Sequence, residues 1–92
     1  MLDEAWRLDP AVSLRPEPFG ALAYHFGTRR LSFLKVKPLV TVVTGLAEAA
    51  TVADALRAAA VPEDQWPAYA KALRTLADSG MITRRDPSEV AA

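Results

Sequence analysis

The spacing of the apolar residues changes near Pro38, and this change constrains the fold more than any other feature of the sequence. Before Pro38, large apolar side chains fall at every second position, as in Leu22, Tyr24 and Phe26, which is typical of a β-strand with one buried face. After it, apolar residues recur at intervals of three and four, which is typical of an amphipathic helix. The sequence therefore predicts an α+β fold, with strands first and helices second.

Three strands are expected in the first half, joined as an antiparallel meander. The first lies between Pro10 and Pro16, the second covers residues 21–26, and the third is "RRLSFLK", residues 29–35. Gly27 can adopt the positive φ of a tight turn, so the second and third strands are predicted to form a β-hairpin. With three helices after it, such a sheet gives a winged-helix-like domain.

Alternation also predicts which side chains of the sheet face the core. The larger ones are expected to point inward: Val12, Leu14, Leu22, Tyr24, Phe26, Leu31 and Phe33. His25 and Leu34 then fall on the opposite face, away from the helices. His25, the only histidine, is interpreted as an ordinary surface residue, because no second ligand stands at a metal-binding spacing from it.

The two edges of the meander are not equally protected. Prolines, which have no N–H to offer a partner strand, flank the first strand at positions 10, 16 and 18. The third strand has no such residue before Pro38, although proteins usually protect an open edge against pairing with another strand. The sequence therefore predicts an edge, residues 29–35, that is free to pair.

Three helices are expected in the second half. Pro38 suits the first position of a helix whose apolar face comprises Leu39, Val42, Val43 and Leu46. The β-branched run "VTVVT" leaves a fourth strand open as an alternative at this place. Thr51 and Asp54 resemble a capping box for a short helix that ends near Ala60.

The last helix is expected to run up to Gly80, which is a typical C-terminal stop. Its apolar stripe comprises Trp66, Tyr69, Ala70, Leu73, Leu76 and Ala77. We expect residues 1–85 to form a single domain and residues 86–92 to be a frayed C-terminal tail.

Composition excludes several classes of function. The chain has no cysteine and eleven residues of each charge, so thiolate metal sites are excluded and a partner bound mainly through phosphates, whether nucleic acid or anionic membrane, is not expected. The acidic residues are scattered, and there is no phosphate-binding loop or nucleophile elbow. The sequence thus predicts a cytoplasmic, non-enzymatic protein without a metal or cofactor, and no stretch is apolar enough to span a membrane.

Two segments, "LRPEPFGALAYHF" and "RRLSFLK", carry a more specific resemblance. With the surrounding sequence, they resemble the mycofactocin precursor-peptide chaperones, a group of PqqD-like peptide-recognition domains, or RiPP recognition elements. The resemblance extends from Trp6 to the "LADSGMI" of the last helix. It implies that this chain binds the leader of the mycofactocin precursor peptide as an added strand and presents it to a radical S-adenosylmethionine maturase, which would hold the iron–sulfur chemistry.

The resemblance also implies where the leader binds. The strand side of the site would be Arg30, Leu31, Ser32, Phe33, Leu34 and Lys35, and the helix side would be Trp66, Tyr69, Ala70, Leu73 and Arg74. On this basis Leu34→Pro should weaken peptide binding and disturb folding less than Phe33→Ala, a change in the expected core.

Two other uses of the same surface remain open. A winged-helix DNA-binding regulator would present Gln65, Lys71, Arg74 and Thr75 to the bases. A homodimer joined edge to edge would hide the third strand instead. A basic cluster of Arg29, Arg30, Lys35 and Lys37 surrounds that strand, and Lys71, Arg74, Arg84 and Arg85 would extend it if the last helix packs beside the strand.

Overall fold

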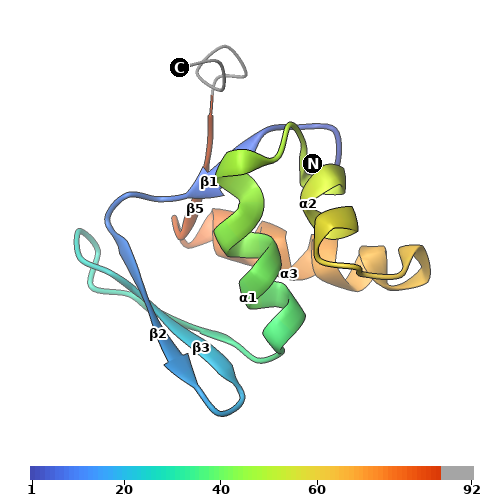
Figure 1. The fold of residues 1–92 in the computed structure, drawn as a ribbon. Coiled ribbons are helices and arrows are strands. Elements are labelled where there is room, and N and C mark those ends of the chain that lie inside the picture. The colour runs from blue at the N-terminus through green and yellow to red at the C-terminus, as the bar shows by residue number, and fades with distance from the viewer. Residues whose placement is uncertain (86–92) are drawn as a thin grey trace.

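The computed structural model describes residues 1–85 of the 92-residue chain (Figure 1). Its strands are β1 Trp6–Leu8, β2 Val12–Glu17, β3 Gly20–His25, β4 Leu31–Leu34 and β5 Ile82–Arg84. Its helices are α1 Lys37–Gly45, α2 Val52–Ala58 and α3 Trp66–Asp78, with short 3-10 turns η1 Leu46–Glu48 and η2 Glu63–Gln65. The predicted α+β fold, an antiparallel meander followed by three helices, is confirmed. The tail expected at 86–92 lies outside the described residues.

The strands form two separate sheets. One is the predicted meander in the order β2-β3-β4, and the other pairs β1 with β5 antiparallel, Trp6 opposite Arg84. The sequence did not predict the second sheet, because three-residue strands are too short to show a period. Figure 1 shows this small sheet at the end of α1 that lies away from the meander.

Hydrogen bonds from Arg85 connect the sheet of β1 and β5 to the η1 region. Its guanidinium is buried and donates from Nε to the Trp6 carbonyl at 3.1 Å and from Nη2 to the Leu46 carbonyl at 3.3 Å and to the Ala49 carbonyl. These carbonyls belong to β1 and to the η1 region. Arg85 is therefore a structural residue and does not extend an exposed basic cluster.

The first helix follows its predicted apolar stripe. Leu39, Val42, Val43 and Leu46 are all buried, and the alternative of a fourth strand at "VTVVT" is wrong. The run is β-branched, yet its three-and-four spacing gives a helix a continuous face to bury between the meander and α2.

The predicted ends of the other two helices are also observed. The Thr51 hydroxyl accepts a hydrogen bond from the Asp54 amide at the start of α2. At the end of α3, Gly80 has φ +79° and the Met81 amide donates to the Leu76 carbonyl at 2.8 Å, the pattern of a Schellman motif.

The face assignment of the hairpin is wrong. Ala21, Ala23 and Leu34 are each only 1% exposed, whereas Leu31 and Phe33 are 56% and 59% exposed. Val12 and Leu14 do pack on the core, but the register sets Leu14 opposite Ala23 rather than opposite a larger residue. A shift of one residue in register exchanges the two faces of a strand, and alternation within one strand cannot reveal it.

The inward alanines have a physical reason. Helix α1 lies against the inner face of β3 and β4, and small side chains on β3 allow its backbone to come close. The larger side chains of the hairpin lie instead on the face that we call the outer face: Phe19, Leu22, Tyr24, Phe26, Leu31 and Phe33. In Figure 1 the meander lies at the lower left, with α1 on one side of it only.

Candidate functional site

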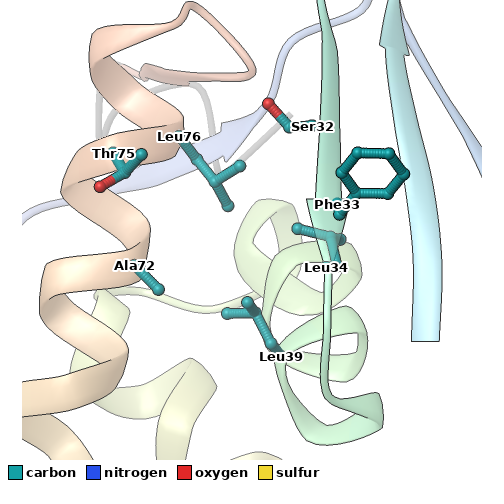
Figure 2. Close-up of a pocket in the computed structure, with 7 residues that line it drawn as sticks. All are labelled: Ser32, Phe33, Leu34, Leu39, Ala72, Thr75 and Leu76. Carbon is teal, nitrogen blue, oxygen red and sulfur yellow. The ribbon is translucent and has the colours of Figure 1, made fainter. Parts of the chain in front are cut away.

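A groove lies between the edge strand β4 and helix α3 (Figure 2). Its volume is about 250 Å³, and it is lined by Ser32, Phe33, Leu34, Leu39, Ala72, Thr75 and Leu76. Figure 2 shows Ala72 and Leu76 of α3 pointing toward β4, with Leu39 of α1 between the two elements. The groove thus has strand backbone along one side and mainly apolar side chains along the other.

The free side of β4 follows from its pairing with β3. The His25 amide donates to the Arg30 carbonyl at 3.0 Å, so Arg30 forms a hydrogen-bonded pair with β3, and alternate residues after it do the same. Ser32 and Leu34 therefore direct their amides and carbonyls toward β3. Those of Leu31, Phe33 and Lys35 are directed away from the sheet.

Gly20 provides an independent check on this orientation. A Cβ atom at Gly20 would lie 2.1 Å from the Leu34 carbonyl oxygen, so this carbonyl points toward β3. Gly20 also has φ +156°, a conformation that favours glycine. A larger residue here would push β4 away from β3 at the end of the groove.

The predicted strand side of the site coincides in part with this groove. Ser32, Phe33 and Leu34 line it, whereas Leu31 and Lys35 are exposed beside it. Leu34 contributes a buried inner-face side chain, which contradicts its expected outward position. The Phe33 ring lies on the opposite side of β4 from α3 (Figure 2).

The predicted helix side does not coincide with it. The groove is lined by Ala72, Thr75 and Leu76 rather than by the predicted residues. Those predicted residues are distributed as follows: Ala70 and Leu73 are buried in the core, Tyr69 is half-buried, Arg74 is exposed, and Trp66 donates from Nε1 to the Val61 carbonyl at 2.9 Å.

The residues that sequence reasoning missed stand at the border of the apolar stripe. Ala72 and Thr75 look like flanking polar-face positions, since one is small and the other polar. With Leu76 they stand at positions i, i+3 and i+4, so they share one face of the helix. Small side chains at the border of a stripe that faces a strand edge are the signal that could have revealed the groove.

The surroundings of β4 are positively charged. No acidic residue occurs between Glu17 and Glu48, whereas Arg29, Arg30 and Lys35 lie in this stretch together with Lys37. All four basic residues are exposed, and none takes part in the ion pairs formed within residues 1–85. A bound segment that carries carboxylates would therefore meet an attractive field.

His25 does not lie on the outer face, as the sequence predicted, but on the inner one. Its Nδ1 accepts hydrogen bonds from the Gly27 and Thr28 amides at 3.0 and 3.1 Å, and its Nε2 lies 3.7 Å from a carboxylate oxygen of Asp9. The side chain is 12% exposed and organises the turn between β3 and β4. Its role is structural, at the turn of the β3–β4 hairpin.

Two further observations limit the chemistry of the described residues. Residues 1–85 contain no group of three histidine or carboxylate side chains close enough together to hold a metal ion. Over the same residues, no helix has the length and apolar content needed to cross a membrane.

Comparison with known proteins gives a consistent result. The model of the peptide chaperone MftB family matches residues 5–83. The chain is 51% identical over 85 residues to peptide chaperone MftB of Mycolicibacterium smegmatis, covering 92% of this chain and 83% of the relative. The corresponding proteins of Mycobacterium ulcerans and Mycobacterium tuberculosis are 47% and 49% identical, with 95% and 90% of this chain and 80% and 76% of the relatives covered. No solved structure matches the chain.

Proposed function

The chain belongs to the peptide chaperone MftB family, and from this membership we propose that it binds the leader of the mycofactocin precursor peptide and presents it to a radical S-adenosylmethionine maturase. The observation that carries the proposal is the groove, which has a volume of about 250 Å³ and lies between the free edge of β4 and helix α3. An extended leader would add to β4 as a further strand of the meander.

The added strand would use both sides of the groove. The outward amides and carbonyls of Leu31, Phe33 and Lys35 would pair with the leader backbone and fix its register. Side chains of the leader alternate between two faces, so one set would enter the space beside Leu39 and Leu76. Apolar leader residues fit that space, and acidic ones fit its charged surroundings.

The free energies involved indicate that the leader needs contacts with α3 in addition to backbone pairing with β4. Three outward residues offer roughly six hydrogen bonds, each worth about 0.5–1.5 kcal/mol net. Ordering a disordered leader costs about 2–5 kcal/mol or more. Because a micromolar complex requires about 8 kcal/mol, backbone pairing alone falls short. The remainder would come from apolar side chains of the leader packed against α3.

In the proposed site, the residues predicted from the sequence have different roles. Residues 30–35 form the strand side of the proposed site, and Ala72, Thr75 and Leu76 form its helix side. Arg74, exposed on the turn that carries Thr75, supplies charge at the rim. Trp66, Tyr69, Ala70 and Leu73 act indirectly, by holding α3 on the core.

In this proposal the chain performs no chemistry of its own. It has no cysteine and so supplies no thiolate ligand to an iron–sulfur cluster, which belongs to the maturase. The chaperone would raise the local concentration of the peptide and fix the orientation of the segment to be modified. Residues 1–85 would act as the peptide-recognition unit.

Calorimetric titration with the precursor peptide, whole and without its leader, tests this function at two salt concentrations. We expect binding that requires the leader and weakens only mildly with salt, because the groove is apolar and the pairing neutral. Binding of duplex DNA with a steep salt dependence would instead favour a nucleic-acid regulator. Failure to bind the whole peptide would contradict the proposal.

A further inference from the structure

The outer face of the meander exposes an unusual number of large apolar side chains. Within residues 1–85, every exposed large hydrophobic residue lies between positions 19 and 36: Phe19, Phe26, Leu31, Phe33 and Val36. Phe26 and Phe33 are about 60% exposed, at 63% and 59%. No described element covers this face, although the opposite face of the same sheet is packed on α1.

These side chains form an organised surface rather than scattered contacts. Phe19 and Phe33 meet edge to face with ring centroids 6.0 Å apart, and Tyr24 and Phe26 do so at 5.0 Å. A hollow of about 480 Å³ is lined by Phe19, Phe33 and Lys35. Four of them, Phe19, Phe26, Leu31 and Phe33, lie on the outer face; each is about half exposed, and together they present on the order of 400 Å² of apolar surface, which is the size of the largest patch on a typical monomer.

Charge indicates what kind of molecule would cover this face. Arg15 and Lys35 are exposed on the outer face, where Arg15 lies 3.5 Å from the Glu17 carboxylate, and the stretch between Glu17 and Glu48 contains four basic residues and no acidic one. Two copies of the chain meeting face to face would bring these like charges together, which costs free energy. A partner with an apolar centre and carboxylates around it would instead be complementary.

The outer face is continuous with the groove. Phe33 supplies outward backbone groups at the edge of β4, while its ring lies on the outer face, so a partner there would sit directly beside a bound peptide. We propose that the outer face docks the enzyme that modifies the peptide, through an acidic-rimmed apolar surface, while the groove holds the leader. This rests on the proposed function and adds a second surface to it.

Two variants test the surface without touching the groove. Phe26→Ala removes an exposed ring, and Arg15→Glu reverses a charge on β2, at the far edge of the meander from the groove. Arg57→Glu is the matched control, because Arg57 is also exposed and also pairs with one carboxylate, but it lies on α2. Each variant is titrated with the purified maturase and, separately, with the precursor peptide.

We expect Phe26→Ala and Arg15→Glu each to weaken maturase binding about 10-fold or more, as central interface residues do, and Arg57→Glu to leave it unchanged. Peptide affinity should stay within about twofold in all three variants, because none lines the groove. Unchanged maturase affinity in both test variants would overturn the proposal. A wild-type dimer that these variants dissociate, or capture of the wild type by phosphatidylserine vesicles without maturase binding, would overturn it as well.

The two proposals fail in distinguishable ways. If the wild type binds maturase but not the precursor peptide, the leader-binding function fails, while the docking surface stands if its variants still lose the maturase. If the wild type binds the peptide but no maturase, the docking surface fails together with presentation to the maturase, while leader binding in the groove stands. Circular dichroism melting of each variant, expected to match the wild type because the changed side chains are exposed, shows that a loss of binding is not a loss of fold.

Discussion

Replacing Phe33 by proline tests the free edge of β4 directly. The Phe33 amide points away from β3, so its loss removes no hydrogen bond of the meander, and proline is tolerated on edge strands at such positions. In the proposed complex, however, a leader carbonyl that pairs with this amide would be left without a donor. A buried carbonyl without a partner costs about 1–3 kcal/mol.

This cost corresponds to a rise of about 5- to 150-fold in the Kd for the precursor peptide. Proline also removes the phenyl ring, so Phe33→Ala is the control that loses the ring but keeps the amide. The difference in Kd between the two variants, measured by calorimetry, isolates the contribution of the backbone donor. Equal affinities would refute the reasoning that the leader pairs with this edge.

Leu34→Pro gives the contrast within the same strand. The Leu34 amide faces β3 and its side chain is 1% exposed, so proline here removes a hydrogen bond of the sheet and a core side chain together. Thermal unfolding should show a large loss of stability for Leu34→Pro and a small one for Phe33→Ala. This order is the reverse of the one expected from sequence, because the two faces of β4 are exchanged.

Three other substitutions test the groove and the stability of the fold. Ala72→Arg should fill the groove and weaken peptide binding about 10-fold or more, whereas Ala68→Arg, exposed on the same helix, should not change the Kd. Ala60 has φ +59° in the C-terminal turn of α2, so Ala60→Gly should stabilise the protein by about 0.5–1 kcal/mol in urea unfolding; destabilisation would contradict this. Arg85→Ala removes the guanidinium donor of the Trp6 and Ala49 carbonyls and one of the two donors of the Leu46 carbonyl, and should cost about 2–4 kcal/mol, seen as a lower melting temperature, while an unchanged melting temperature would mean that water replaces the guanidinium.

The helical half was predictable because its signals are local. Thr51 caps α2, Gly80 ends α3, the apolar stripe of α1 is buried, and the stripe of α3 packs on the core, all as their spacing predicted. Each of these features depends on residues within one or two turns of the same helix. Contacts between residues far apart in sequence determine only which element packs against each apolar stripe.

The sheet was predictable only in its connectivity. Strand positions follow from alternation, but the inward face depends on register and on how closely α1 approaches, which are properties of residues far apart in sequence. For the same reason the α3 residues that line the groove include Ala72 and Thr75, which lie beside the predicted apolar stripe and not in it. The pairing of β1 with β5 joins the two ends of the described chain and has no local signal.

That pairing has a consequence for the order in which the protein is made. The meander and α1 involve residues 12–45, whereas β1 finds its partner strand only after residue 84 has been synthesised. Because α3 begins at Trp66, a ribosome-bound chain that has already formed the hairpin presents the edge of β4 without the helix beside it. During that interval an extended segment that reaches the edge can pair with its backbone but meets no side chain of α3, so the complete groove exists only after the helix has been made.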